Sequence, residues 1–466
     1  MKVLIHCDQT NTKNILTLIE EQGYTIPCNC NGNHRCNGKV YSFDCSMVPK
    51  NSMTVEIPEY SEKISSISFS SKNRTPGPAD TLLIDLGTTT VALALIDSKT
   101  KHLRNTHTFV NPQKKYGSDV ISRIQASLDG MKSQLTQVIT EALKVESENI
   151  CKKNGQTVSD ICQCYIGGNT TMIHLLLGYD LRSLSASPFE IKATMPVPFM
   201  YNNCNVTILP WQSAFVGGDL TAGFYSCRLD LSAGNSLLVD LGTNGEMILS
   251  CDHHYYSTST AAGPAFEGNG LSYGCPGIPG AISHVTLRGL MPRLTTIDDK
   301  LPIGICGSGA ISVAAELLRK NYVDADGILT GKFPSNGVLL ARKQDGTSIT
   351  FSADDFRTIQ LAVAAIAAGI DTLCHTAGIT PNEIHHLYVG GGLGFFIDLE
   401  DCITLNLFSS IPKESIHVMG NTCLQGLFRY ATEDHLLVDS SQITLKNINL
   451  ANSDYFQKKY ITHLTY

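Results

Sequence analysis

Short apolar runs of strand length alternate along this chain with longer segments of helical periodicity. Residues 81–97 (TLLIDLGTTTVALALID) form two apolar runs on either side of a Gly-Thr turn, and residues 236–250 (SLLVDLGTNGEMILS) repeat this arrangement. Apolar runs of this length bounded by turn residues are typical of buried strands. Each segment is therefore predicted to be a pair of strands, and their similarity predicts an internal duplication.

The segments between and after these repeats alternate between the two kinds of pattern. Strands are predicted at 162–167 and 386–389, and helices at 169–177, 310–318 and 354–374. This alternation is typical of α/β proteins with largely parallel or mixed sheets. The predicted architecture is two related α/β lobes with a cleft between them.

The N-terminal end of the chain is predicted to form a small unit of its own. Strands are expected at 1–7, 40–43 and 53–57, with a short helix at 11–22. A stretch rich in Ser, Lys, Pro and charge follows, and this composition is typical of a linker. The predicted organisation is 1–60 for the N-terminal unit, 61–79 for the linker, 80–205 for the first lobe and 206–466 for the second lobe.

Composition narrows the possible functions. The chain has 466 residues, a net charge of -7, 42% hydrophobic and 17% charged residues. These numbers fit two or three packed domains, and the lack of a basic surplus argues against nucleic acid or an anionic membrane as partner. No leader-like N-terminus and no uncharged apolar stretch of about 18 residues is apparent, which predicts a cytoplasmic chain without a membrane span.

Two turns with the same sequence pattern carry the candidate chemistry. The first is Asp85-Leu86-Gly87-Thr88-Thr89-Thr90, and the second is Asp240-Leu241-Gly242-Thr243-Asn244-Gly245. Glycine lets backbone N–H groups approach a phosphate, and the Thr and Asn side chains add hydrogen bonds. The leading aspartates can hold Mg²⁺ directly or through water. A single turn of this kind also occurs in ordinary β-hairpins, but two copies between buried strands favour phosphate binding.

Three further glycine loops lie at strand ends or helix starts, where backbone groups can approach an anion or a nucleoside. They contain Gly168, Asn169 and Thr170; Gly307, Ser308 and Gly309; and Gly390, Gly391 and Gly392. None matches a Walker A or dinucleotide-binding fingerprint. The alternative for each loop is a tight turn with a purely structural role.

The paired turns followed by a late glycine loop resemble the superfamily of acetate and sugar kinases, heat-shock chaperones and actin. The resemblance implies two RNase-H-like lobes that bind ATP and Mg²⁺ between them. The segment AFVGGDLTAG (214–223) is similar to the sugar-kinase segment that bears the catalytic Asp. By that resemblance Asp219 orients or deprotonates the attacking water, and the alternative is an Asp that caps a helix N-terminus.

Several ordered motifs resemble a narrower family, the reductive activators of corrinoid proteins. They are NPQKKYGSDVISRI (111–124), GGNTTMIHLLLG (167–178), LVDLGTNGEMIL (238–249), STAAGPAFEG (259–268), GICGSGAI (304–311), GGGLG (390–394) and GNTCLQG (420–426). The resemblance implies an ATPase that permits reduction of a Co(II) corrinoid to Co(I). It also implies a corrinoid protein or corrinoid methyltransferase as partner, a low-potential electron donor, and a plant-type [2Fe–2S] cluster in an N-terminal ferredoxin-like domain.

The N-terminal unit departs from that family pattern. Four of the sixteen cysteines crowd into it, namely Cys28, Cys30, Cys36 and Cys45. The position three residues after Cys36 is Lys39, where a plant-type cluster has a cysteine. Four thiolates suffice for a [2Fe–2S] cluster in altered geometry, they also suit Zn²⁺, and a unit without metal is the third alternative.

Two other functions fit parts of the pattern. A small-molecule kinase of the sugar-kinase type would need a substrate pocket near Asp219 and leaves the cysteines unexplained. A non-redox ATP-dependent interaction module would retain partner binding alone. A homodimer is compatible with the superfamily, although no surface pattern in the sequence requires one.

Overall fold

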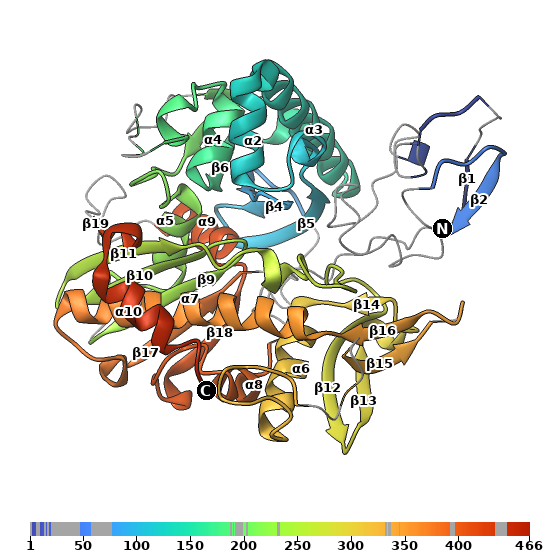
Figure 1. Cartoon of the computed structure of the whole chain (residues 1–466). Helices are drawn as coiled ribbons and strands as arrows, with labels where there is room; N and C mark the ends of the chain where they lie inside the picture. The colour runs from blue at the N-terminus through green and yellow to red at the C-terminus, as the bar shows by residue number, and fades with distance from the viewer. Residues whose placement is uncertain are drawn as a thin grey trace.

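The computed structural model of the chain describes residues 2–5, 10–13, 15, 18–19, 47–56, 77–186, 189, 191, 199–201, 204–230, 234–330, 333, 337–343, 345–391, 397–433 and 445–466. Within these residues the chain forms two α/β lobes and a small N-terminal unit (Figure 1). Fold class is thus mixed α/β of the actin and sugar-kinase type, as the sequence predicts.

The N-terminal unit contains one antiparallel strand pair, β1 (Lys2–Ile5) with β2 (Met53–Glu56). Ile5 and Val55 from these strands are buried, and so are Ile15 and Ile19. The strands predicted at both ends of the unit are confirmed. The strand predicted at 40–43 and the four cysteines Cys28, Cys30, Cys36 and Cys45 lie outside the described residues.

The first lobe is built on a six-stranded sheet in the order β5-β4-β3-β6-β8-β7. Strands β3, β4 and β5 are antiparallel, whereas β3, β6 and β8 run parallel. The strands are β3 (Thr81–Leu86), β4 (Thr90–Asp97), β5 (His102–Val110), β6 (Gln163–Gly168), β7 (Phe199–Tyr201) and β8 (Cys204–Ile208). The helices are α2 (Val120–Ala126), α3 (Lys132–Lys153) and α4 (Thr170–Leu177). The chain leaves this sheet after Ile208, slightly beyond the predicted lobe boundary, because β8 pairs with β6.

The second lobe repeats this topology. Its sheet has the order β18-β17-β9-β10-β11-β19, in which β9, β10 and β11 are antiparallel and β9, β17 and β18 are parallel. The strands are β9 (Ser236–Leu241), β10 (Gly245–Cys251), β11 (His254–Thr260), β17 (His386–Gly390), β18 (Ile416–Gly420) and β19 (Leu445–Asn447). Numbered in chain order, the first sheet reads 3-2-1-4-6-5 and the second reads 6-3-2-1-4-5. Both share the order 3-2-1-4, followed by one further strand that is parallel to the fourth, which confirms the predicted duplication and the RNase-H-like lobes.

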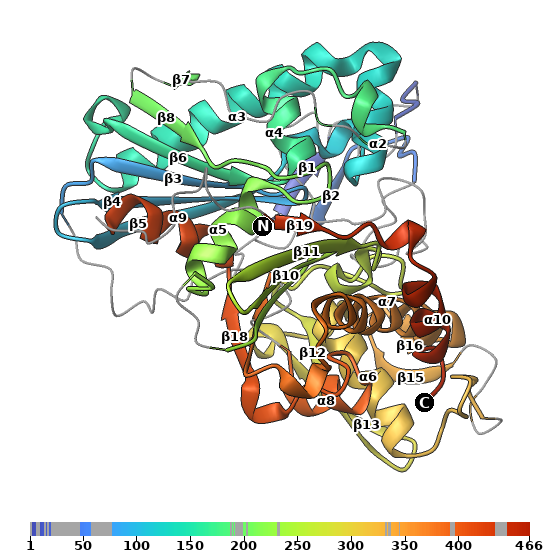
Figure 2. The same ribbon diagram turned by 90° about the vertical axis from the view of Figure 1, so that its left-hand side faces the viewer.

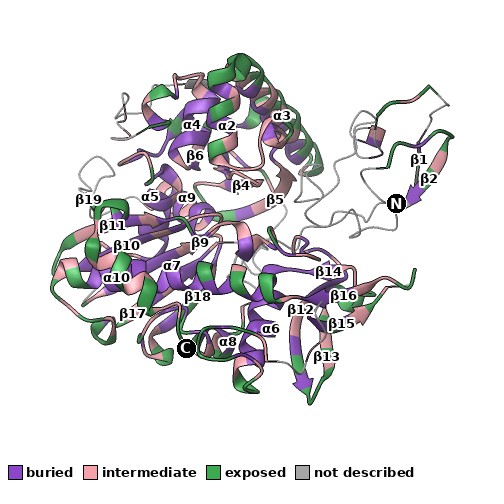
Figure 3. Ribbon diagram, in the orientation of Figure 1, coloured by how far each residue is buried: buried purple, intermediate pink, exposed green. Residues whose placement is uncertain are grey.

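A large insertion separates β11 from β17. Its strands are β12 (Ala281–Arg288), β13 (Met291–Thr296), β14 (Gly304–Ile305), β15 (Val338–Arg342) and β16 (Ser348–Phe351). Its helices are α6 (Gly307–Arg319) and α7 (Ala353–Ala377), and α8 (Leu399–Thr404) and α10 (Asp454–Thr462) lie farther along the chain. By length and composition α7 passes the test for a membrane span, but 83% of its most apolar window is buried, as in a core helix (Figure 3).

Alternation along β3 and β9 explains why both strands are apolar throughout. Leu82 and Ile84 of β3 face the core of the first lobe, and Leu237 and Val239 of β9 face the core of the second. The intervening residues Leu83 and Leu238 belong to a third core between the lobes. Because side chains alternate along a strand, Asp85 and Asp240 lie on the same faces as Leu83 and Leu238 and are directed to the interlobe side.

Two helices fill the third core and connect the lobes. Helix α5 (Gly218–Ser226) follows a first-lobe strand and packs on β6 of that lobe and on β9 and β10 of the second lobe. Helix α9 (Thr422–Thr432) follows a second-lobe strand and packs on β3, β4 and β6 of the first lobe. The two helices also pack against each other between the sheets (Figure 2). At their crossing, a Cβ atom on Gly426 would lie 1.8 Å from the carbonyl oxygen of Ala222. The α5–α9 pair is therefore in backbone contact.

We expect Gly426→Ala to destabilise the protein by roughly 1–3 kcal/mol, because the added methyl group overpacks the α5–α9 contact. Alanine is the better helix former, so helix propensity alone predicts the opposite sign. Thermal denaturation followed by circular dichroism measures the effect. Gly369→Ala in α7 is the matched control, since the tightest contact of its Cβ would be with the movable end of Met247, at 3.0 Å. An equal loss in both variants would contradict the packing argument.

Candidate functional site

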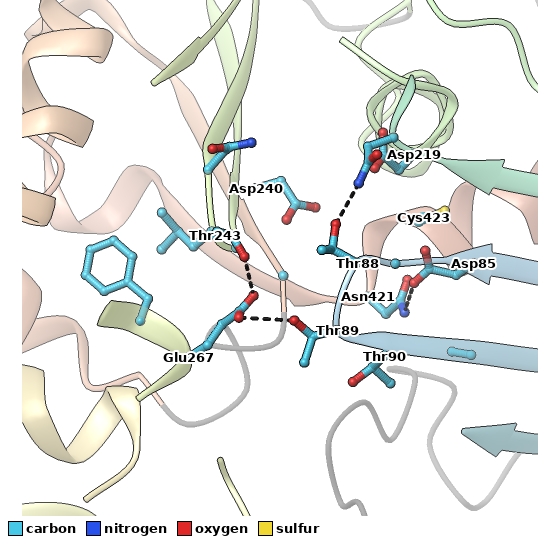
Figure 4. Close-up of a pocket in the computed structure, with 18 of the residues that line it drawn as sticks. Asp85, Thr88, Thr89, Thr90, Asp219, Asp240, Thr243, Glu267, Asn421 and Cys423 are labelled. Atoms are coloured by element: carbon cyan, nitrogen blue, oxygen red, sulfur yellow. Dashed lines mark hydrogen bonds between the residues drawn. The ribbon is translucent and has the colours of Figure 1, made fainter. Parts of the chain in front are cut away.

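A cavity of about 270 Å³ opens between the lobes where the two DLGT turns face each other (Figure 4). It is lined from both lobes and from the N-termini of α5 and α9. Of the residues singled out from the sequence, fourteen line it: Asp85, Gly87, Thr88, Thr89, Thr90, Asn169, Asp219, Asp240, Gly242, Thr243, Asn244, Gly307, Ser308 and Gly391. Segments far apart in sequence thus converge on one site.

The first turn is held in shape by its own backbone and by Asn111. A Cβ at Gly87 would lie 2.3 Å from the carbonyl oxygen of Thr90, so the reversal requires glycine. The Asn111 side chain donates to the carbonyl oxygen of Gly87 at 2.8 Å, and its backbone N–H donates to that of Thr89 at 2.9 Å. Asn169 donates to the Thr88 hydroxyl at 2.9 Å while capping α4. The turn is preorganised before any ligand arrives.

Some of the predicted residues pack around the cavity without lining it. Gly168, Gly245, Gly309 and Gly390 do not line it, and each is packed so closely that a Cβ would lie 2.0–2.9 Å from a neighbouring atom. Thr170 is also absent from the lining, because its hydroxyl donates to the carbonyl oxygen of Ser213 at 2.7 Å. These residues therefore pack around the cavity, and their part in ligand binding stays a prediction. Gly392 lies outside the described residues.

Four carboxyl groups meet at the base of the cavity. Asp85, Asp219, Asp240 and Glu246 all line it, and Glu246 stands directly opposite Asp240 in the β9–β10 pair. Like charges in this cross-strand position repel each other. Glu246 was not among the predicted residues, although it lies within the quoted motif at 238–249.

Burial raises the pKa of all four groups, and repulsion from neighbouring carboxylates adds to the shift of Asp85, Asp219 and Glu246. The pKa of Asp85 rises to about 6, opposed by hydrogen bonds from Asn421 and Cys423. The pKa of Asp219 rises to about 7, mainly because the group is desolvated and in addition because the negative charges of Asp240 and Asp85 lie nearby. Burial also raises the pKa of Asp240, and raises that of Glu246 well above its ordinary value. Together the four groups favour a bound cation.

The donor set of this cluster fits Mg²⁺. Hard divalent cations prefer carboxylate oxygens, and Mg²⁺ usually retains several water ligands. Within the described part of the chain, no three of these carboxylates bring ligand atoms within 4.8 Å of one another. That spacing suits an ion held by one or two carboxylates and by water, with Asp85 and Asp240 nearest the turns.

The start of α9 supplies a group of site residues that the sequence argument did not assign. Asn421 caps the helix and donates to Asp85 at 2.7 Å, and the Thr422 hydroxyl donates to Asp240 at 3.0 Å. Cys423 is buried beside them and lines the same cavity. One helix start thus holds the leading aspartate of each turn. The sequence signal for these residues is the motif GNTCLQG, which contains all three, although the motif alone assigns no role to them.

Glu267 is the second residue without a predicted role. It lines the cavity from the loop between β11 and β12, at the end of the motif STAAGPAFEG. One carboxylate oxygen accepts from the Thr89 hydroxyl at 3.2 Å and the other from the Thr243 hydroxyl at 3.1 Å. Burial raises its pKa, against the effect of these two hydrogen bonds and of nearby Lys114. Glu267 therefore joins the two turns across the cleft.

Asp219 lies in the first turn of α5, and the helix N-cap is Gly217. Its carboxylate accepts from the N–H of Leu220 at 2.8 Å and faces the cavity. The N-cap alternative is therefore wrong for this residue, because the chain enters the helix two positions earlier. A carboxyl group with a pKa near 7 in a phosphate-sized cleft is suited to accepting a proton from water.

We expect metal- and nucleotide-free Asp219→Asn to unfold at a higher temperature than the wild type at pH 8. The folded-state pKa of Asp219, about 7, lies above that of an unfolded Asp, so the ionised form destabilises the fold at pH 8. Below pH 6 the wild-type group is protonated in the folded state and the difference should shrink. Thermal melts in EDTA at the two pH values measure this.

Asp371→Asn provides the opposite control. Although burial alone raises the pKa of Asp371, hydrogen bonds from His463, Ser409 and Lys459 lower it overall. Its ionised form is therefore stabilising, and the variant should melt at a lower temperature at pH 8. A destabilised Asp219→Asn at pH 8 would contradict the electrostatic account.

Comparison with known proteins places this geometry in a family. Residues 81–232 match the family model for the RACo middle region, and residues 234–466 match that for the C-terminal domain of RACo, the ASKHA domain. The corrinoid activation enzyme RamQ of Eubacterium limosum is 30% identical over 427 residues, which cover 85% of this chain and 72% of that protein.

A second relative and one solved structure agree. The Co(II) methylated amine-specific corrinoid protein reductase of Methanosarcina barkeri is 25% identical over 432 residues, covering 83% of this chain and 76% of that protein. The structure of a reductive activator for corrinoid,iron-sulfur protein matches all of this chain and 78% of its own, with a TM-score of 0.75 and 24% identity. The match shows a shared fold. By both of its family matches and its curated relatives, the chain belongs to the RACo family.

Proposed function

We propose that this chain couples ATP hydrolysis to the one-electron reduction of a Co(II) corrinoid, held by a partner protein, to Co(I). One observation carries the proposal: the duplicated DLGT turns face each other over half-buried carboxylates in a cavity between the two lobes. The curated relatives are named for corrinoid activation and for Co(II) corrinoid protein reduction. Neither name describes a small-molecule kinase, which leaves that alternative without support from an observation.

Each part of the cleft has a role in this proposal. The turns at Gly87–Thr90 and Gly242–Asn244 receive the phosphates, with Thr hydroxyls and backbone N–H groups as donors. Asp85 and Asp240 hold the Mg²⁺ that neutralises phosphate charge, and Asp219 orients and deprotonates the attacking water. Phe266, Cys306, Gly307 and Ser308 also line the cavity and are suited to contact the nucleoside.

The α5–α9 pair explains how hydrolysis at this site acts on a partner. Both helices begin at the phosphate end of the cavity, and each packs against the sheet of the opposite lobe. A change at the phosphates therefore changes the preferred angle between the lobes. A partner is affected only if it binds the closed and open forms with different affinity, so its docking surface must span both lobes or their hinge.

The electron requires a source of low potential, and the cysteine segment is the candidate within this chain. We assign Cys28, Cys30, Cys36 and Cys45 to a [2Fe–2S] cluster, since four thiolates complete its ligand set. A Zn²⁺ site or a metal-free segment with an external electron donor are the alternatives. The cytoplasmic location and the possible homodimer stay predictions.

We expect Asp240→Asn to lower ATP turnover, in the presence of a Co(II) corrinoid protein, by about 100-fold or more, because it removes a charge that the transition state requires. Phosphate release and the absorbance change on formation of Co(I) are measured in the same anaerobic reaction. The exposed variant Asp252→Asn is the control and should retain both activities. Full turnover in Asp240→Asn would remove the site assignment, and wild-type phosphorylation of a sugar or acid would favour the kinase alternative.

Anaerobically purified protein is expected to contain about two irons and two acid-labile sulfides per chain, with thiolate-to-iron absorption bands that bleach on reduction. Elemental analysis, sulfide analysis and visible spectroscopy test this directly. Cys36→Ser should lose the iron, whereas Cys162→Ser, which changes an exposed first-lobe cysteine, should retain it. Zinc in place of iron, or neither metal, would make an external electron donor necessary.

A further inference from the structure

Glu267 accepts hydrogen bonds from the Thr89 and Thr243 hydroxyls, the same groups that would donate to a phosphate bound at the two turns. Thr89 and Thr243 each donate to one oxygen of the Glu267 carboxylate, as Figure 4 shows. A hydroxyl group has a single hydrogen to donate. Neither threonine can therefore donate to Glu267 and to a nucleotide phosphate at the same time.

The two hydrogen bonds differ in what they connect. Thr243 belongs to the same lobe as Glu267, whereas Thr89 belongs to the opposite lobe. The loop that carries Glu267 is anchored in the second lobe, because its residues Ala265 and Phe266 are buried in that lobe's core. Opening the lobes would therefore break the bond to Thr89 and leave the bond to Thr243 intact.

Charge adds a second reason for competition. A carboxylate, like a phosphate, carries negative charge on oxygens that accept hydrogen bonds. A phosphate bound at the two turns would lie beside the Glu267 carboxylate, and two negative charges that close together repel each other. The turns also offer their donors from both lobes at once, which is the geometry that a bridging phosphate requires. Glu267 thus occupies the position and hydrogen-bonding role of the ligand that these turns are built to hold.

We propose that Glu267 is an interlobe latch that substitutes for nucleotide phosphate and holds the cleft together until ATP displaces Thr89 from it. The latch rests on the proposed ATPase function for the identity of the nucleotide. It gives the cleft two alternative closed arrangements, one bridged by the Glu267 carboxylate and one bridged by phosphate. The change from one to the other releases the second-lobe loop from the first lobe, so nucleotide binding itself alters the contact between the lobes.

Binding of a fluorescent ATP analogue to Glu267→Ala and Glu267→Gln, with Mg²⁺ and in EDTA, tests the competition. Both variants should bind the analogue about tenfold more tightly than the wild type in EDTA, because the competing charge is gone. Glu267→Gln preserves the side-chain size if Glu267→Ala fails to fold. Unchanged affinity overturns the proposal, and so does weaker binding confined to the Mg²⁺ condition, which would make Glu267 a metal ligand.

Glu246→Gln, measured in EDTA, shows the effect of losing a carboxyl group alone. It removes a carboxyl group from the same cavity, and no hydrogen bond between the Glu246 side chain and Thr89 or Thr243 is found in the described part of the chain. Its affinity for the analogue should rise clearly less than that of Glu267→Gln, because the substitution frees neither threonine hydroxyl. Equal tightening in Glu246→Gln and Glu267→Gln would show a general charge effect and overturn the latch.

Hydrogen exchange without nucleotide tests the latch independently of the ligand's identity. Mass spectrometry of peptides covering residues 81–97 should show faster exchange in Glu267→Ala than in the wild type, because the turn has lost its tether to the other lobe. Unchanged exchange overturns the latch. If the wild type binds no ATP analogue but its residues 81–97 still exchange more slowly than those of Glu267→Ala, the proposed ATPase function is removed and the latch remains.

Discussion

The crossing of α5 and α9 is the contact on which the rest of this structure depends. Each helix arises from one lobe and packs against the sheet of the other, and Gly426 lets their backbones touch. The crossing fixes where the two helices begin, and both begin at the cavity. Asp219 enters the site from α5, and Asn421 and Thr422 enter it from α9. The contact between the lobes and part of the cavity lining are thus built from the same two helices.

The site combines groups that are unfavourable together without a ligand. Four carboxyl groups share a partly buried space in which their pKa values are raised, and two turns present donors suited to phosphate. A nucleotide with its divalent cation satisfies both sets at once, since the cation meets the carboxylates and the phosphates meet the donors.

Duplication gives the lobes the same strand order, but the two halves of the site are not equivalent. Asp240 faces Glu246 across its strand pair, whereas the corresponding partner of Asp85 is Ala92. Glu267 likewise belongs to the second lobe alone. The first lobe therefore contributes mainly the turn and its supports, and the second lobe contributes most of the charge. This asymmetry suits a site in which one lobe holds the ligand and the other responds to it.

The sequence by itself predicted the strands on either side of the duplicated turns, together with β6 and β17, and it put Asp85 and Asp240 at the ends of two of these strands. Alternation and turn chemistry are local properties of the chain. Resemblance to a known family also singled out Asp219, which lines the same cavity. Only the tertiary structure decided the roles of Asn421, Thr422 and Glu267, whose partners are far away in sequence. The same holds for Gly168, Gly245 and Thr170, which pack behind the cavity wall. Whether a residue lines a cavity or supports it depends on contacts between distant segments, and those contacts exist only once both lobes have folded and met.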